Sequence, residues 1–290
     1  MPETTPAYPA QLPHVLIDRA VEAALAEDLG LAGDLTTQAT ISPQAEATAT
    51  INAREAGIVT GLALAEAAFR LVGPGLAFTA LLKDGDVVKP GQDVARIAGN
   101  ARLIMSAERV ALNFLSHLSG ISSHTRKFAD ALAGTKTRIC DTRKTTPGLR
   151  AFEKYAVRCG GGWNHRFGLD DAILIKDNHI AVAGGVGKAV AGARAFAGHL
   201  VAIEVEVDTL EQLAEALAAG ALAVLLDNMD NATLVKAVAL NNGRAKLEAS
   251  GGVTLERVRG IAETGVDFIS TSRITMASEP LDLGLDIVIV

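Results

Sequence analysis

Positively charged side chains are concentrated in one segment, residues 141–176, of the 290-residue sequence. Arg143 and Lys144 follow directly after the apolar run at 137–141, so we expect them at the end of a buried strand. Arginine forks match planar carboxylates, and lysines act as point charges toward phosphates. Because cations that share a pocket repel one another unless an anion fills it, we expect a polyanionic ligand. The basic residues of this segment are Arg143, Lys144, Arg150, Lys154, Arg158, His165, Arg166 and Lys176.

Carboxylates follow in the next part of the chain. Glu204 and Glu206 lie two residues apart, so they face the same side of a strand, and Asp227 ends a later apolar run. Carboxylates without histidine or cysteine partners suit a hard cation, and we expect Mg²⁺ shared with substrate phosphates. An ion pair with a neighbouring lysine is the alternative for Glu204.

Small residues follow two further apolar runs. Ser250, Gly251 and Gly252 come after the first run, and the segment from Ser270 to Arg273 comes after the second. Small residues that lead into a helix let backbone N–H groups approach a phosphate closely. We therefore expect these two loops to form a phosphate-binding cradle.

The elements that position these residues are six short apolar runs that alternate with helical segments. This alternation indicates parallel βαβ units, and each run ends in a polar residue. In a parallel barrel those ends meet at the carboxyl edge of the sheet, where active sites lie. An open doubly wound sheet is the alternative, although no glycine fingerprint follows a first strand. The runs, with their terminal residues, are 137–141 (Asp141), 172–177 (Lys176), 201–208 (Glu206), 222–228 (Asp227), 246–250 (Ser250) and 267–272 (Thr271).

The residues before 137 show a different pattern, which predicts an α+β domain. Residues 1–13, rich in proline and threonine, are expected to form a loose arm. Elsewhere the patterns predict a helix at 14–29, a strand within 47–61, a helix at 61–73, strand segments at 81–99 and one or two helices at 103–133.

The loop after Asp141 is also expected to contain a helix. Pro147 is suited to open a helix over 148–158, in which Lys154 and Arg158 lie four residues apart on one face. We favour a solvent-facing side for this pair, with a place in the anion pocket as the alternative. The three glycines at 160–162 allow close backbone approach or positive φ angles.

Composition excludes several other classes of protein. Apolar residues make up 49% and charged residues 21%, which excludes a disordered chain, and the net charge of −6 argues against nucleic-acid binding. No apolar stretch is long enough to span a membrane, and no secretory signal is recognisable. We expect a cytoplasmic protein in which Cys140 and Cys159 are buried, reduced thiols.

The segment DTRKTTPGLRAFEKYAVRCGGGWNHRFGLDDAILIKDNH (141–179) closely resembles the quinolinate phosphoribosyltransferase family. The resemblance continues through ERVALNFLSHLSGI, EVEVD, LLDN, EASGG, TGVDFIS and LDLGLD, which together span most of the chain. It implies an α/β fold with an N-terminal α/β sandwich domain at 1–120 and a C-terminal incomplete, TIM-like α/β barrel at 121–274. It also implies that a tail at 275–290 returns to the first domain, and that the active protein is a homodimer.

The family's reaction joins quinolinate to phosphoribosyl pyrophosphate with Mg²⁺, releasing pyrophosphate and CO₂ and giving nicotinate mononucleotide for NAD biosynthesis. The resemblance implies that Lys144, Lys176, Glu206 and Asp227 are catalytic. It also implies that Arg109 reaches the substrate from the partner subunit. Mg²⁺ would be held at Glu206 and Asp227 through the pyrophosphate. The implied substrate-binding residues are Arg109, Thr142, Arg143, Lys144, His165, Arg166, Lys176, Glu206, Asp227, Ser250, Gly251, Gly252, Thr271, Ser272 and Arg273.

The resemblance implies that Arg143, His165 and Arg166 hold the two carboxylates of quinolinate. It implies that the two small-residue loops hold the 5-phosphate of phosphoribosyl pyrophosphate. In the segment TSRITMAS (271–278), Arg273 and Met276 stand where many members of the family carry small residues and a histidine. The family's phosphate contacts in this segment therefore do not carry over directly to this sequence. Two alternatives share the scaffold: a paralogous phosphoribosyltransferase-like protein associated with molybdenum transport, and a non-catalytic binding protein.

Overall fold

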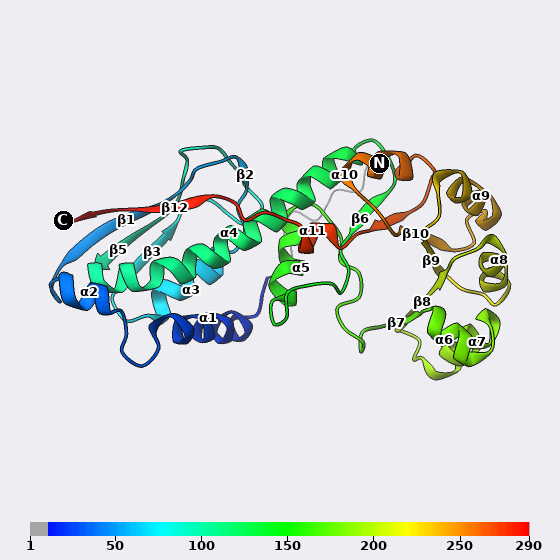
Figure 1. Cartoon of the computed structure of the whole chain (residues 1–290), viewed down its shortest axis with the longest axis horizontal. Coiled ribbons are helices and arrows are strands. Elements are labelled where there is room, and N and C mark those ends of the chain that lie inside the picture. Colours follow the sequence, from blue (N-terminus) through cyan, green and yellow to red (C-terminus); the bar gives the residue numbers. More distant parts are fainter. Residues whose placement is uncertain (1–10, 290) are drawn as a thin grey trace. The chain divides into compact units, whose positions relative to one another are not determined.

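The structure is a computed structural model that describes residues 11–289. The loose arm was expected at residues 1–13, of which residues 1–10 lie outside the described part. The chain forms two units. Figure 1 shows the whole chain, coloured by residue number. The first unit holds the described residues up to Arg126, residues 151–161 and those from Ser278 onward, and the second holds residues 127–150 and 162–277.

The first unit contains a four-stranded antiparallel sheet with the strand order β12-β1-β5-β3. The tail of the chain supplies its edge strand β12, in which Leu285 pairs with Ile51 of β1. Strand β1 alternates between exposed and buried residues at its start, because one face of the sheet covers the core. The strands of this unit are β1 (Glu46–Ala53), β3 (Ala77–Ala80), β5 (Asp93–Asn100) and β12 (Leu283–Ile289), with a separate pair, β2 (Gly57–Ile58) and β4 (Val87–Val88).

Helices α1 (His14–Leu29) and α3 (Leu62–Leu71) confirm the helices predicted at 14–29 and 61–73. The segment predicted as one or two helices is a single helix, α4 (Ala101–Ala131). A short helix that the sequence pattern did not indicate, α2 (Leu35–Thr40), is capped by Asp34, whose Oδ1 accepts the Thr37 backbone N–H at 2.9 Å.

Helix α5 (Arg150–Cys159) differs from its prediction in two respects. It begins at Arg150 rather than 148, because Gly148 has a φ of +82° and cannot continue a right-handed helix. The side chain of Lys154, expected in solvent, is only 3% exposed. The reason is that α5 packs within the first unit, where the Phe152 ring lies 6.4 Å from that of Phe114.

Glycines close the end of α5 as the sequence predicts. A Cβ at Gly160 would lie 2.4 Å from the Ser122 backbone oxygen, so only glycine fits there, and Gly161 has a φ of +92°. The nearby Tyr155 hydroxyl donates to Asp84 Oδ2 at 2.9 Å. These contacts explain why residues 151–161 belong to the first unit rather than to the predicted barrel domain.

The second unit is built on a six-stranded parallel sheet with the order β6-β11-β10-β9-β8-β7, which confirms all six predicted strands. Because β6 and β7 form opposite edges, the sheet is an open arc and the barrel is incomplete. Its strands are β6 (Arg138–Cys140), β7 (Ala172–Ile175), β8 (Ala202–Val207), β9 (Ala223–Asp227), β10 (Lys246–Ser250) and β11 (Phe268–Ser270). Its helices are α6 (Asp177–Ala183), α7 (Val186–Phe196), α8 (Leu210–Ala218), α9 (Asn231–Asn241), α10 (Leu255–Ala262) and α11 (Arg273–Met276).

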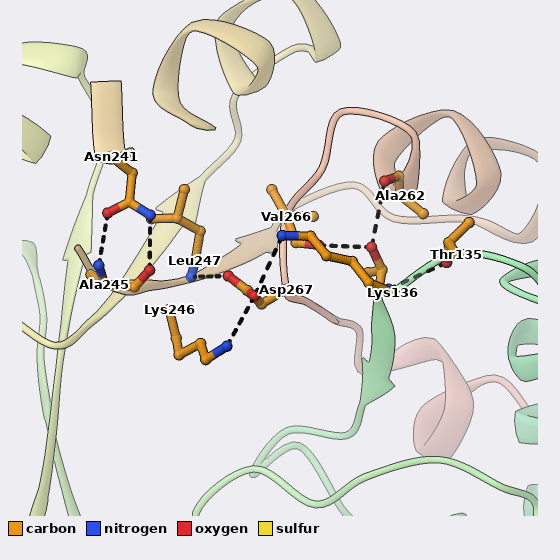
Figure 2. Close-up of polar contacts among 10 residues, drawn as sticks. Thr135, Lys136, Asn241, Ala245, Lys246, Leu247, Ala262, Val266 and Asp267 are labelled. Carbon is orange, nitrogen blue, oxygen red and sulfur yellow. Dashed lines mark hydrogen bonds and ion pairs between the residues drawn. The ribbon is translucent and has the colours of Figure 1, made fainter. Parts of the chain in front are cut away.

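Polar side chains form hydrogen bonds at the amino ends of β10 and β11 (Figure 2). Asp267, just before β11, accepts the Leu247 backbone N–H at 3.1 Å and the Lys246 ammonium at 3.2 Å. The Asn241 side chain pairs with both backbone groups of Ala245, at 2.8 and 2.9 Å. These bonds fix how β10 enters the sheet beside β11.

Cys140 and Cys159 are buried free thiols, as predicted. Over the described residues, none of the helices combines the length and apolar character needed to cross a membrane.

Candidate active site

A cavity of about 690 Å³ opens at the carboxyl ends of the parallel strands. The loops that follow the strands supply its walls, as the polar strand ends predict. It gathers thirteen of the predicted site residues, namely Thr142, Arg143, Lys144, His165, Arg166, Lys176, Glu206, Asp227, Ser250, Gly251, Gly252, Thr271 and Ser272.

Two predicted residues are not among those that line this cavity. Arg109 is exposed on α4 in the first unit, and Arg273 is exposed at the start of α11. Their predicted contacts with substrate therefore remain expectations.

Arg143 and Arg166 each place a buried donor in the site. Their Nε–H groups have no hydrogen-bond partner among the residues that the structure describes. Burial lowers the pKa of Arg166 from the high value usual for a guanidinium group, and the positive charge of Arg143 lowers it further. A buried donor left without a partner is costly, so this side of the cavity is built to receive an anion.

His165 is held at both ring nitrogens. Its Nε2 lies 2.9 Å from Glu204 Oε2, and its Nδ1 accepts the Arg166 backbone N–H at 2.8 Å. With Nδ1 as an acceptor, Nε2 is the ring nitrogen whose proton is directed at Glu204. Glu204 is thus paired with a histidine, so the lysine partner considered for it is wrong.

Glu248 also faces this cavity and was not predicted as a site residue. The available signal was its position on the run 246–250, two residues before Ser250 and therefore on the same face of the strand. Its Oε1 lies 3.7 Å from His165 Nε2, and ligand atoms of His165, Glu204 and Glu248 all lie within 4.8 Å of one another.

Lys176 and Glu206 form an ion pair on neighbouring strand ends, with Lys176 Nζ 3.4 Å from Glu206 Oε2. Burial raises the pKa of Glu206, and the charge of Lys176 opposes this shift. Asp227, at the end of the adjacent strand β9, accepts a hydrogen bond from the Asn228 side chain at 2.7 Å. The two carboxylates offer the oxygen ligands that Mg²⁺ prefers, so the residues present fit that ion.

The loop after β10 exposes backbone rather than side chains. Gly251 and Gly252 have φ angles of +94° and +58°, and a Cβ at Gly251 would lie 2.1 Å from Asn228 Oδ1. In the loop after β11, the Thr271 N–H instead donates to Cys140 O at 3.1 Å, and the Arg273 N–H to Thr271 Oγ1 at 3.2 Å. The glycine loop is therefore the better candidate to hold a phosphate with backbone N–H groups.

Buried guanidinium donors, a carboxylate pair and a glycine loop at the carboxyl ends of a parallel sheet define a barrel-type enzyme of phosphorylated, anionic substrates. The family model described as quinolinate phosphoribosyl transferase, N-terminal domain, matches residues 34–119, and the model of the C-terminal domain matches residues 121–286. The chain therefore belongs to the quinolinate phosphoribosyltransferase family.

Individual relatives agree with this assignment. The chain is 44% identical over 274 residues to a probable carboxylating nicotinate-nucleotide pyrophosphorylase of Bacillus subtilis, covering 94% of each sequence. It is 45% identical to a protein of the same name from Synechocystis, covering 95% of this chain and 94% of that one. A solved nicotinate-nucleotide pyrophosphorylase from Francisella tularensis superposes with a TM-score of 0.93 at 40% identity, over 97% of this chain and 99% of that chain.

Proposed function

We propose that this protein transfers a phosphoribosyl group from phosphoribosyl pyrophosphate to quinolinate, with decarboxylation to nicotinate mononucleotide. The observation that carries the proposal is that Arg143 and Arg166 line one cavity, each with a buried Nε–H group that has no partner among the described residues. Two such donors match an acceptor with two adjacent carboxylates. The family and its named relatives support the same reaction.

The chemistry needs positioning and electrostatic stabilisation more than covalent catalysis. As pyrophosphate leaves, positive charge develops on the ribose carbon, and the carboxylates of Glu206 and Asp227 stabilise it. The pyridine nitrogen of the acceptor then forms the new bond to that carbon. Its positive charge makes the ring an electron sink, so the adjacent carboxylate leaves as CO₂ and the ring carbon takes up a proton.

Mg²⁺ is part of the proposal. Glu206 and Asp227 would hold it together with the pyrophosphate oxygens, and when bound it supplies charge neutralisation for the leaving group. The charge of Lys176, 3.4 Å away, opposes the rise in the Glu206 pKa that burial causes, and Lys144, which lines the same cavity, neutralises further phosphate charge.

The partner-subunit contribution is proposed in the same way. Arg109 is exposed on α4 and is not among the cavity residues of its own chain, which leaves it available to a second copy. An isologous homodimer would exchange this residue reciprocally and build two equivalent sites. A cytoplasmic location likewise remains a proposal.

A direct assay tests the reaction. The protein is incubated with quinolinate, phosphoribosyl pyrophosphate and Mg²⁺, and nicotinate mononucleotide, pyrophosphate and CO₂ are measured. Glu206→Gln is expected to lose most of the activity, whereas Glu263→Gln, which alters a carboxylate in an exposed ion pair with Arg259, is expected to keep it. Absence of the mononucleotide from the wild-type reaction would overturn the proposal.

A further inference from the structure

Glu248 is a buried carboxyl group that the proposed reaction has not yet used. It lies on β10, its residue is 6% exposed, and it lines the same cavity as Arg143 and Arg166. Its Oε1 is buried and has no hydrogen-bond partner among the residues that the structure describes. An unpartnered oxygen on a buried side chain that faces a cavity points to a contact with whatever occupies that cavity.

None of the residues that the structure describes around Glu248 donates a hydrogen bond to its Oε1. His165 is 3.7 Å away, beyond hydrogen-bond distance, and its Nε2–H is already directed at Glu204 Oε2 at 2.9 Å. Nδ1 of the same ring accepts the Arg166 backbone N–H at 2.8 Å. Two carboxyl groups thus lie beside one imidazole ring, and only Glu204 is within hydrogen-bond distance of it.

The remaining groups around Glu248 favour its protonated form. Burial is the largest cause that raises the pKa of Glu248, and the charges of Glu204 and Asp141 raise it further. His165 and a hydrogen bond with Ser270 oppose the shift, and the resulting pKa is about 7. An ionised carboxylate at this position would also repel a carboxylate ligand, whereas a neutral acid would donate to it.

We propose that Glu248 is a specificity-determining residue that carries a proton on Oε1 and donates a hydrogen bond to a carboxylate of the acceptor. This inference rests on the proposed function, since it assigns Glu248 a role toward the same dicarboxylate that Arg143 and Arg166 bind. The proton stays on Glu248, so no bond is made or broken. His165 holds the neighbouring Glu204, with Nε2 2.9 Å from Glu204 Oε2.

Two substitutions separate a donor from a space-filling side chain. Glu248→Gln is neutral and retains an N–H donor, whereas Glu248→Met has similar length and no donor. At about pH 6, calorimetric titration with quinolinate is expected to give tighter binding to the Gln variant than to the Met variant. The difference is expected to be about ten- to hundredfold, the range of a hydrogen bond to a charged group.

The dependence on pH supplies the second readout. Between about pH 6 and about pH 8.5, wild-type protein is expected to lose quinolinate affinity several-fold as Glu248 ionises, and the Gln variant is not. At the higher pH the Gln variant should therefore bind quinolinate more tightly than wild type. Phosphoribosyl pyrophosphate affinity and the melting temperature, measured in parallel, show whether either substitution disturbs the site or the fold as a whole.

Three outcomes would overturn the inference. The first is a Gln variant that binds quinolinate as weakly as the Met variant while both are folded. The second is the same loss of affinity with pH in wild type and the Gln variant, and the third is wild-type affinity that does not change with pH. A wild-type protein that binds no quinolinate at either pH would overturn the proposed function itself, and the role of Glu248 with it.

Discussion

Arg143 and Arg166 face the same cavity, each with a buried Nε–H group that has no partner among the described residues. Burial is the larger cause that lowers the pKa of Arg166, and the charge of Arg143 is the second, so the two guanidinium groups repel each other. This arrangement is unfavourable without an anion, and it sets the preference of the site for the number of carboxylates on its ligand.

Nicotinate is expected to be a poor substitute for quinolinate. It has one carboxylate, so one of the two buried guanidinium groups would stay unpaired at a cost of about 3–5 kcal/mol. The check is kcat/KM for the two acids under the same conditions, with a difference of at least about a hundredfold expected. Comparable values for both acids would show that the surplus of cations serves another purpose.

Replacing Arg143 with lysine is expected to weaken acceptor binding selectively. Arg143→Lys keeps the charge but removes the planar fork and its Nε–H, so quinolinate affinity should fall about tenfold or more while phosphoribosyl pyrophosphate affinity changes little. Arg96→Lys, in an exposed ion pair with Asp93, is the matched control and should change neither affinity. An unchanged quinolinate affinity in Arg143→Lys would make Arg143 a structural residue of the cavity rim.

Mixed dimers are expected to recover activity from two inactive variants. If Arg109 acts in the partner's site, a dimer of Arg109→Ala with Lys176→Ala has one site with both defects and one with neither. With random re-pairing after reversible dissociation, activity should return to about a quarter of the wild-type value. A mixture that stays inactive would place Arg109 in the site of its own chain.

Asp267 is expected to stabilise the second unit in a pH-dependent way. Burial acts to raise its pKa, but the Leu247 N–H and the ammonium groups of Lys246 and Lys136 outweigh this and lower the pKa below its ordinary value. A lowered pKa contributes stability above the unfolded-state pKa, and this contribution disappears as pH falls through the folded-state value. The carboxylate and its partners are those shown in Figure 2.

Asp267→Asn is therefore expected to lower the free energy of unfolding by about 1 kcal/mol at neutral pH. The difference from wild type should shrink as pH falls below about 4. Denaturant titration over this pH range measures it, with Asp93→Asn, which alters an exposed ion pair, as a control that should change stability by less than about 0.5 kcal/mol. A constant difference across the pH range would mean that charge on Asp267 is not its source.

The sequence by itself determined the six parallel strands and the polar residues that end them. Each run of apolar residues predicts a strand locally, and the carboxyl ends of parallel strands meet at one edge of the sheet. That rule is independent of the details of packing, so it placed Arg143, Lys176, Glu206 and Asp227 around one cavity before any contact was known.

Only the tertiary structure decided which side chains pair and which are buried. Lys154 looked like a surface residue from helical spacing, yet α5 packs into the first unit and buries it. The partner of Glu204 is His165, 39 residues away, and the same ring lies 3.7 Å from Glu248 Oε1, beyond hydrogen-bond distance. Such relationships join residues far apart in the chain, and local periodicity carries no information about them because they depend on how separate elements approach in space.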